Sequence, residues 1–259
     1  MTAVAGPGGR AAGPGRAPRG PALLEVRAVT KRFGGVVANQ EVTFDVAPGE
    51  IVGVIGPNGA GKSTLFDVIT GFYRPDRGEV RFAGAPITGL RPDRINRLGI
   101  GRTFQKLRPF AGMTVRENVM VGALLRIPAV EAARAEADRC LALLGLADKA
   151  TAFARELSTG QRKRLEMARA LATRPRLLLL DEVTGGVDQR SIPDLVALVG
   201  RLRDEGVTLV VIEHNMRVIM SVATRIIALH LGRKIADGPP GAIVRDRRVV
   251  EAYLGAAYL

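Results

Sequence analysis

The segment Gly56-Pro57-Asn58-Gly59-Ala60-Gly61-Lys62-Ser63 constrains the fold more than any other part of this chain. It fills all four fixed positions of G-x-x-x-x-G-K-[ST], a phosphate-binding loop that connects a strand to a helix. The apolar run 50–55 before it predicts a buried strand, and residues 63–69 predict the start of a helix. The sequence therefore predicts an α/β fold with a phosphate site at this connection.

Each residue type in the loop suits an anion. The glycines let successive backbone N–H groups point at one phosphate, and the N-terminus of the following helix adds partial positive charge. Lys62 supplies a charge for the β- and γ-phosphates, and the Ser63 hydroxyl suits Mg²⁺. A glycine-rich turn without a ligand is the alternative, which the complete motif disfavours. The nucleotide-binding residues expected here are Asn58, Gly59, Ala60, Gly61, Lys62, Ser63 and Thr64.

A second apolar run, residues 177–180, ends in two carboxylates. It consists of leucine throughout, as in a parallel strand that is covered on both faces. Asp181 and Glu182 follow at its carboxyl end, where open α/β sheets bind ligands. Asp181 suits Mg²⁺ through water, and Glu182 suits the orientation or deprotonation of a water that attacks the γ-phosphate. Acids also end strands because strands end at water; the phosphate-binding loop makes that alternative the weaker one.

The segment Leu157-Ser158-Thr159-Gly160-Gln161 precedes a predicted helix over 162–171. A small polar residue at a helix start offers a hydroxyl and free N–H groups to an anion. By local physics alone, an ordinary N-cap is the better interpretation of Ser158. The residues of this helix expected to face inward are Leu165, Ala168, Ala170 and Leu171, with Arg162, Lys163, Arg164 and Arg169 as its polar members.

The chain contains two histidines and one cysteine. His214 follows the apolar run 207–212, at the strand end where the nucleotide is expected. His230 lies within a strand-like run and is interpreted as structural. Cys140 lies in an Ala- and Leu-rich helical stretch and is interpreted as packing. One cysteine excludes an internal disulfide and a multi-cysteine metal site, and it fits a reducing compartment.

In their order, these motifs resemble the ATP-binding subunit of ABC transporters over about residues 24–255. The resemblance implies a P-loop NTPase of α/β class, with a mostly parallel sheet, an N-terminal antiparallel β portion and an inserted α-helical subdomain. It also implies ATP and Mg²⁺ as ligands. The segments that carry it are the loop 56–63, Arg102-Thr103-Phe104-Gln105, residues 157–161, Asp181-Glu182 and Ile212-Glu213-His214-Asn215.

The resemblance assigns a role to each matching residue. Gln105 senses Mg²⁺ and the attacking water, Glu182 is the catalytic base, and His214 contacts the γ-phosphate. Ser158, Gly160 and Gln161 contact the ATP that a second ATPase subunit holds, which makes the active form a homodimer or heterodimer. Phe33 stacks on adenine, and Asp188 belongs to a loop that crosses to the partner. Mg²⁺ is assigned to Ser63, Gln105 and Asp181.

Within this family, the chain is most similar to ATP-binding subunits of branched-chain (hydrophobic) amino-acid importers. Three residues depart from the pattern: Val183 replaces a proline, Thr159 stands where many members have glycine, and Asn215 replaces a common Asp. None of them removes a chemically necessary group, so an active ATPase is expected. The segments that carry the subgroup are 99–105, 113–119, 165–171, 212–216 and 251–255.

The pattern along the chain predicts its organisation. Residues 23–90 contain strand signals, 91–157 become helical, with a capping box at Thr114-Val115-Arg116-Glu117, and 158–231 alternate helix and strand. We expect a disordered tail over 1–22, an ATPase domain over 23–255 with a helical subdomain at about 91–160, and a C-terminal tail over 256–259. The insertion is expected to carry residues 157–161 away from their own phosphate-binding loop and toward that of a second subunit.

The formal charge of +13 is concentrated in two segments of the 259-residue chain. The tail 1–22 has three arginines and no acid, and 91–126 has eight basic residues against two acidic ones. Nucleic-acid binding, attraction to anionic headgroups and an ordinary solvated face are the three interpretations. No interleaved aromatic residues or nucleic-acid motif accompany the charge, and we expect no nucleic-acid partner.

No apolar run approaches the length of a membrane span. The expected function is therefore an ATP-hydrolysing subunit that powers an importer of branched-chain or other hydrophobic amino acids through separate transmembrane permease subunits. An extracytoplasmic solute-binding protein would be an indirect partner, and the expected location is cytoplasmic, peripheral on the inner face of the cell membrane. The alternatives are an ABC ATPase of a lipid- or lipopolysaccharide-handling transporter and a non-transport ABC ATPase.

Overall fold

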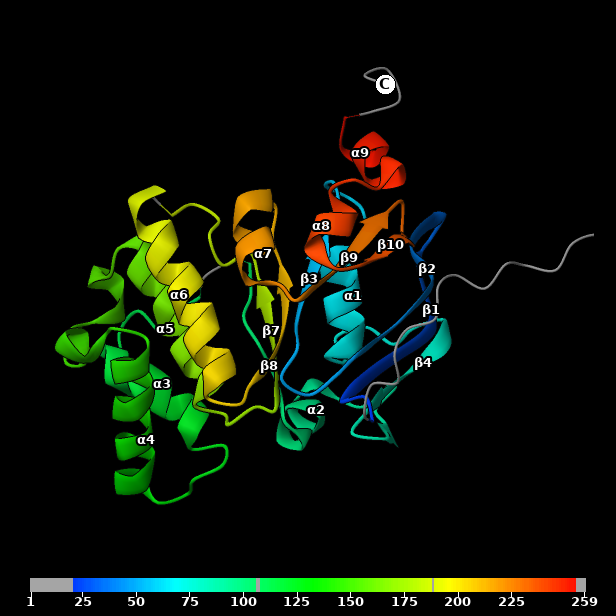
Figure 1. Ribbon diagram of the computed structural model, residues 1–259. Helices are drawn as coiled ribbons and strands as arrows, with labels where there is room; N and C mark the ends of the chain where they lie inside the picture. Colours follow the sequence, from blue (N-terminus) through cyan, green and yellow to red (C-terminus); the bar gives the residue numbers. More distant parts are fainter. Residues whose placement is uncertain (1–20, 106–107, 188, 255–259) are drawn as a thin grey trace, which may run out of the picture.

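The computed structural model describes residues 21–105, 108–187 and 189–254 (Figure 1). Most of the tail 1–22, the C-terminal tail 256–259 and Asp188 therefore lie outside the described residues. Within the described ranges, no helix combines the length and apolar composition needed to cross a bilayer.

A six-stranded sheet forms the centre of the molecule, in the order β10-β9-β3-β8-β7-β6. Five strands are parallel, and β10 joins the edge in the antiparallel direction. Every residue of β3, β7 and β8 is buried, as expected for parallel strands covered on both faces. The strands are β3 (Ile51–Ile55), β6 (Ile100–Arg102), β7 (Leu177–Asp181), β8 (Thr208–Ile212), β9 (Arg225–His230) and β10 (Arg233–Gly238).

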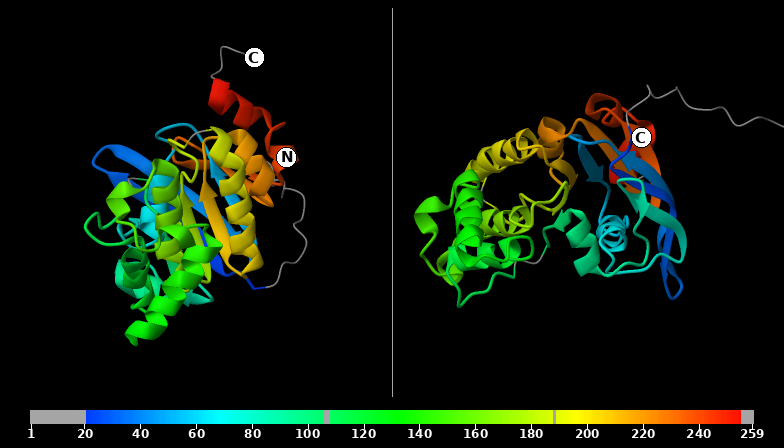
Figure 2. Two further views of the ribbon diagram at one scale, coloured as in Figure 1. Left: turned by 90° about the vertical axis from the view of Figure 1, so that its left-hand side faces the viewer. Right: turned by 90° about the horizontal axis from the view of Figure 1, so that it is seen from below.

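A second, antiparallel sheet has the order β2-β1-β4-β5. Helix α1 (Lys62–Ile69) packs its buried face into one hydrophobic core with both sheets, and Figure 2 shows it lying between them. The expected antiparallel portion is therefore confirmed. Its strands are β1 (Leu24–Phe33), β2 (Val36–Val46), β4 (Arg77–Phe82) and β5 (Ala85–Pro86).

Three helices form a group on one side of the large sheet (Figure 1). These are α3 (Val115–Ala123), α4 (Val130–Leu143) and α5 (Thr159–Leu171), of which α3 contacts both others. Thr114 caps α3 in the predicted capping box with Glu117. Cys140 is buried in this group as expected, and burial raises the pKa of its thiol to about 12, which makes it an inert packing residue.

The remaining helices lie along the sheets and at the C-terminal end (Figures 1 and 2). They are α2 (Pro92–Leu98), α6 (Ile192–Asp204), α7 (Met216–Val222), α8 (Pro240–Ile243) and α9 (Arg247–Leu254), together with short 3-10 turns at Ala147–Lys149, Ala154–Glu156 and Gln189–Ser191.

One expectation about the region 91–157 is wrong. It contains strand β6, which pairs with β7 at the edge of the parallel sheet. Residues 100–102 are too few for an alternating or continuous apolar pattern, and the strand contains Gly101. A Cβ on Gly101 would lie 3.1 Å from Leu178 Cδ1 and 3.2 Å from Pro175 Cβ. Close packing therefore explains why residue 101 is glycine. Because glycine has low strand propensity, the sequence did not predict this strand.

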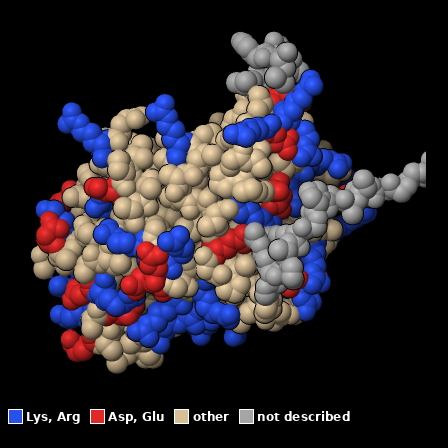
Figure 3. All heavy atoms as spheres, in the orientation of Figure 1, with Lys and Arg blue, Asp and Glu red and all other residues tan. Residues whose placement is uncertain are grey.

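The basic segment 91–126 makes many contacts within the chain. Arg102 pairs with Asp67, and Arg116 pairs with Asp138. Arg126 donates to three main-chain carbonyl oxygens, those of Asn96, Arg97 and Thr173. On the face shown in Figure 3, basic and acidic side chains are interspersed with a larger basic area along the lower edge.

Candidate active site

The phosphate-binding loop leaves the sheet at the carboxyl end of β3, as predicted. Gly59 and Gly61 have φ of 78° and 95°, in the left-handed region that favours glycine. A Cβ on Gly61 would lie 2.1 Å from the carbonyl oxygen of Ala38, so no other residue fits there. Asn58, Gly59 and Ser63 are exposed, Thr64 is half-buried, and Ala60 is buried.

Lys62 is folded back onto its own loop. Its Nζ donates to the carbonyl oxygens of Gly56 at 2.7 Å and Pro57 at 3.0 Å. Burial lowers the pKa of this lysine, against the attraction of Glu182 and Asp181. The two carboxylates therefore lie close enough to the loop for their charge to act on Lys62.

Asp181 ends β7 and is almost completely buried. Its main-chain N–H donates to Thr103 Oγ1 at 3.0 Å, and its Oδ2 lies 3.4 Å from Arg102 Nη2. Burial raises the pKa of the carboxyl, and the arginine opposes that shift. Its other oxygen, Oδ1, is buried and has no hydrogen-bond partner among the described residues. Such an unpaired oxygen is costly unless another ligand binds it.

Glu182 and His214 meet at the ends of the neighbouring strands β7 and β8. Glu182 Oε1 lies 2.8 Å from His214 Nε2. The backbone of Glu182 has φ of 53°, which is unusual for a residue with a side chain. Its N–H donates to the carbonyl oxygen of Ile212 and its own carbonyl accepts from Lys163 Nζ. These two contacts hold the main chain of Glu182 in this conformation, and His214 contacts its carboxylate.

Glu213 links the ends of β7 and β8 through buried hydrogen bonds. It is buried, and it accepts hydrogen bonds from the main-chain N–H of Thr184 at 2.7 Å and from Thr184 Oγ1 at 3.0 Å. The main-chain N–H of His214 also donates to Glu213, at 3.2 Å. The loop after Glu182 is therefore fastened to the segment that carries His214.

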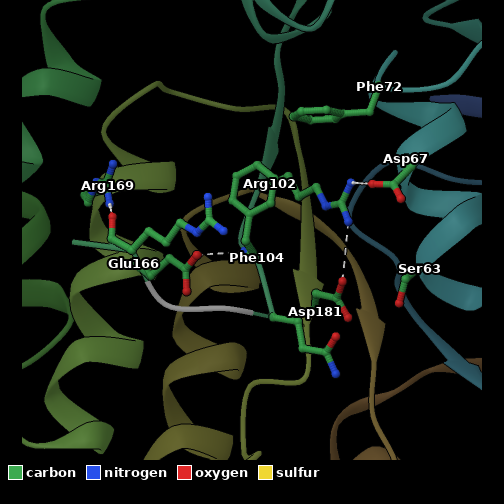
Figure 4. Close-up of a pocket in the computed structure, with 10 residues that line it drawn as sticks. Ser63, Asp67, Phe72, Arg102, Phe104, Glu166, Arg169 and Asp181 are labelled. Carbon is green, nitrogen blue, oxygen red and sulfur yellow. Dashed lines mark hydrogen bonds and ion pairs between the residues drawn. The ribbon is translucent and has the colours of Figure 1, made fainter. Parts of the chain in front are cut away.

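A cavity of about 510 Å³ lies beside this cluster (Figure 4). Arg102 lies at its centre, with Nη1 2.5 Å from Asp67 Oδ1 and the guanidinium over the rings of Phe66, Phe72 and Phe104. Across the cavity, Glu166 accepts from the main-chain N–H of Phe104, and burial raises the pKa of its carboxyl to about 7. The residues that line it are Ser63, Asp67, Phe72, Arg102, Phe104, Gln105, Arg108, Glu166, Arg169 and Asp181.

The structure thus brings Ser63, Gln105 and Asp181 to one cavity, as the sequence suggested. Asp67 and Glu166 were not anticipated as members, and Arg102 was noted only as part of a motif. They belong to no local pattern of their own, because Arg102 pairs with Asp67 and Asp181 across 35 and 79 residues, and the contact of Glu166 with Phe104 spans 62. Such long-range pairs leave no signal in a single sequence.

Ser158 and Gly160 lie in a different hollow, lined by Gly145, Asp148, Ser158, Gly160, Gln161, Arg164, Ser191 and Leu195. Ser158 is the N-cap of α5, in a capping box with Gln161. The inward residues predicted for α5 are all buried, but so is Lys163, which was grouped with the polar members. The two hollows share no residue.

Phe33 ends β1 and is 41% exposed, and Lys31 Nζ lies over its ring, 5.3 Å from the centroid. The Phe33 ring packs edge-on against Tyr73, with ring centroids 5.0 Å apart. Asp188, predicted to cross to a partner subunit, lies outside the described residues.

Comparisons with known proteins agree with this geometry. The family model described as "ABC transporter" matches residues 39–185, and that of the "Branched-chain amino acid ATP-binding cassette transporter" matches residues 233–258. The chain is 40% identical to the high-affinity branched-chain amino acid transport ATP-binding protein BraF of Pseudomonas aeruginosa, over 91% of this chain and 98% of the relative. It is 38% identical to LivG of Escherichia coli K12, which carries the same description, over the same shares.

Solved structures give the same result. The chain matches MJ1267, an ATP-binding cassette of an ABC transporter, with a TM-score of 0.84 and 34% identity over 91% of this chain and 100% of the other. The ADP conformation of MJ1267 matches with a TM-score of 0.83 and 32% identity, over 91% and 99% of the two chains. The dimeric cassette MJ0796 matches with a TM-score of 0.77 and 30% identity, over 84% and 98%.

Proposed function

Because this chain belongs to the ABC transporter family of ATP-binding proteins, we propose that it powers an importer of branched-chain or other hydrophobic amino acids. The chain is an ATPase by its family and fold. The proposed cargo is supported by the relatives BraF and LivG and by the match of residues 233–258.

The contact between Glu182 and His214 carries the proposed chemistry. Glu182 Oε1 and His214 Nε2 are 2.8 Å apart, at the carboxyl ends of β7 and β8, and β8 lies next to β3, which leads into the phosphate-binding loop. In this mechanism, Glu182 orients the attacking water and accepts its proton, and His214 holds Glu182 and contacts the γ-phosphate. A positioned general base contributes about 10²–10⁴-fold to a rate.

The loop residues bind the nucleotide. Backbone N–H groups of residues 58–64 surround the phosphates at the start of α1, and Lys62 exchanges its two carbonyl partners for phosphate oxygens. Phe33, with its partly exposed ring, stacks on the adenine. Lys62 stabilises the negative charge that develops on the transferred phosphoryl group.

The residues present also fit Mg²⁺. The buried Asp181 Oδ1 lacks a partner among the described residues, and Ser63 and Gln105 line the same cavity. No group of three or more His, Cys, Asp or Glu able to hold a metal occurs in the described ranges. Mg²⁺ needs only one or two protein ligands and completes its shell with water and phosphate. The bound ion would neutralise charge on the β- and γ-phosphates, and Asp181, Ser63 and Gln105 would hold it.

The second half of each site comes from a second ATPase subunit. Ser158, Gly160 and Gln161 line a hollow that shares no residue with that of Ser63 and Asp181, which supports their assignment to the nucleotide of a second copy. The N-terminus of α5 suits the γ-phosphate of the ATP held by the partner. Asp188 completes this interface in our proposal. The permease subunits bind near residues 105–110, the chain lies at the inner face of the membrane, and an extracytoplasmic solute-binding protein delivers the amino acid.

Hydrolysis by the chain with its permease subunits tests this proposal. We expect Glu182→Gln to reduce kcat at least about a hundredfold while ATP binding remains. Glu131→Gln, which changes a carboxylate with 83% side-chain exposure, is the matched control and should be neutral. An inactive parent complex would refute the ATPase proposal, and full activity in Glu182→Gln would refute the role of that residue. Uptake of leucine, isoleucine and valine into vesicles tests the cargo.

A further inference from the structure

The C-terminal helix reaches the phosphate-binding loop. The main-chain N–H of Gly56, the first residue of the loop, donates to the hydroxyl oxygen of Tyr253 on α9 at 2.7 Å. The two residues are 197 positions apart in the chain. Tyr253 lies in the segment that matches the branched-chain amino acid transporter model, and Gly56 lies in the part that matches the general family.

Gly56 needs this partner because it lies where β3 leaves the sheet. The parallel pairing of β3 with β9 ends at Ile55 and Ala228, so the ladder gives no residue pair at Gly56. Gly56 is buried and has φ of 152°, and a Cβ there would lie 2.2 Å from the carbonyl oxygen of Leu229. Its N–H is thus shielded from water, and a buried N–H without a partner is costly.

The other main-chain polar group of Gly56, its carbonyl, contacts Lys62. The carbonyl oxygen of Gly56 accepts from Lys62 Nζ at 2.7 Å, while its N–H donates to Tyr253. A shift of this residue would therefore move both the start of the loop and the lysine that is proposed to bind phosphate.

Helix α9 is fixed well enough to hold the hydroxyl in place. Val249 is buried against the hydrophobic core, and α9 contacts β10. Asp246 precedes the helix and accepts from the main-chain N–H of Arg248 at 2.9 Å, and Arg247 pairs with Glu251 one turn later. Tyr253 is one turn beyond the buried Val249, so the packing of that valine orients the tyrosine.

We propose that Tyr253 is a positioning residue of the nucleotide site, through which the C-terminal helix sets the conformation of the phosphate-binding loop. The inference rests on the proposed function of Gly56–Ser63 in nucleotide binding. The Tyr253 hydroxyl accepts from the Gly56 N–H and so holds the first residue of the loop in the orientation that lets the loop wrap the phosphates. Losing the hydroxyl weakens the binding of ATP and ADP alike, because both use the same loop, and leaves the chemical step unchanged.

Tyr253→Phe tests the proposal because it removes one oxygen and keeps the ring. We expect the Kd for both nucleotides, measured by calorimetry, to rise about threefold to tenfold, the worth of one hydrogen bond. KM for ATP should rise by the same factor and kcat should stay within about twofold. The amide hydrogen of Gly56, followed by NMR after glycine-selective labelling, should exchange faster. Arg245→Gln, at an exposed position just before this helix, is the control and should change none of these quantities.

Three results are decisive. Equal Kd values and an unchanged Gly56 exchange rate in Tyr253→Phe would overturn the proposal. A fall in kcat at constant KM would also overturn it, because it would place Tyr253 in the chemical step. A wild-type chain that binds neither nucleotide would instead refute the proposed function, which separates the two failures. Val249→Ala loosens α9 without removing the hydroxyl, and we expect it to raise Kd in the same direction.

Discussion

Lys163 donates a hydrogen bond of 2.5 Å from its Nζ to the main-chain carbonyl oxygen of Glu182. Lys163 lies on the second turn of α5 and is buried, and Ser158 caps the first turn of the same helix. Our proposal assigns Ser158 to the ATP of the partner subunit and Glu182 to the ATP of its own. One helix therefore joins a residue of each site, and Lys163 is the contact through which a shift of α5 would reach the catalytic carboxylate.

Lys163→Met tests this connection because it keeps the length of the side chain and removes the donor. The carbonyl of Glu182 would lose its charged partner at a residue whose left-handed backbone already costs energy. We expect kcat to fall about tenfold and the free energy of unfolding to fall by about 1–3 kcal/mol. ATPase assays and urea unfolding measure the two effects. Arg201→Met, on the exposed side of α6, is the control, and an unchanged kcat in Lys163→Met would show that the contact is not used.

Gly160→Ala tests the assembly of two subunits without disturbing the folding of either one. A Cβ on Gly160 would find its nearest neighbour, Val187 Cγ1, at 3.7 Å, an ordinary contact, and alanine favours helices by about 0.5–1 kcal/mol over glycine. We therefore expect stability to be unchanged or slightly higher. In the Glu182→Gln background, MgATP should convert the monomer to a dimer, and the added methyl group should weaken that dimer because the proposed interface requires close approach at Gly160.

Size-exclusion chromatography with light scattering measures this dimer with and without MgATP. Gly200→Ala is the matched control, since a Cβ there meets nothing within 4 Å and α6 has no proposed role in the interface. A Glu182→Gln protein that stays monomeric in MgATP would contradict the two-subunit site. Undiminished dimerisation in the Gly160→Ala variant would contradict the placement of Gly160 in it.

The buried pair of Arg102 and Asp181 is predicted to contribute to the stability of the fold. Their side chains are 8% and 2% exposed, and Arg102 also pairs with Asp67. Arg102→Met should lower the free energy of unfolding by about 3–5 kcal/mol, because it leaves a buried carboxylate uncompensated. Asp181→Asn in the same chain should recover part of that loss, and a double-mutant cycle measures the coupling.

The control for this cycle is Arg91→Met, whose side chain is 83% exposed and pairs with Asp93 at the surface. Surface pairs of this kind contribute at most about 1 kcal/mol. Additive effects of Arg102→Met and Asp181→Asn would show that the two charges do not support each other.

The sequence predicted the parts of this molecule that depend on local patterns. The strand, glycine-rich loop and helix around Lys62 were predicted because backbone geometry requires glycine at Gly59 and Gly61. The Thr114 capping box was predicted because its two partners lie three residues apart. The proximity of Asp181, Glu182 and His214 followed from the rule that parallel strands end at one edge.

Contacts between distant elements could not be predicted in this way. Strand β6 is three residues long and glycine-containing, so its pairing with β7 depends on main-chain hydrogen bonds that carry no sequence pattern. The burial of Lys163 follows from the position of the Glu182 carbonyl, 19 residues away. Tyr253 was noted only as part of a family resemblance, and its contact with Gly56 required the path of the whole chain.

The last prediction concerns Glu166 and pH. Burial raises the pKa of its carboxyl from about 4.5 to about 7 in the folded protein, although the N–H of Phe104 and the charge of Lys163 oppose the shift. Between these two values the folded state binds more protons than the unfolded state at this residue, so its contribution to stability falls as pH rises. The destabilisation caused by burying the ionised Glu166 carboxylate is absent below the unfolded-state pKa and complete above the folded-state pKa.

Glu166→Gln removes this titration and keeps an oxygen that accepts from Phe104. We expect the variant to gain roughly 1–3 kcal/mol over the wild type between about pH 5 and pH 8, measured by urea unfolding at both values. Glu117→Gln is the opposite case: hydrogen bonds from Thr114 lower the pKa of that exposed carboxyl, so its stabilising effect is present above its unfolded pKa and lost as pH falls. The Glu117→Gln variant should therefore be less stable than the wild type at both pH 5 and pH 8, and its stability relative to the wild type should not rise at pH 8. A Glu166→Gln variant whose difference from the wild type does not change with pH would show that Glu166 ionises normally.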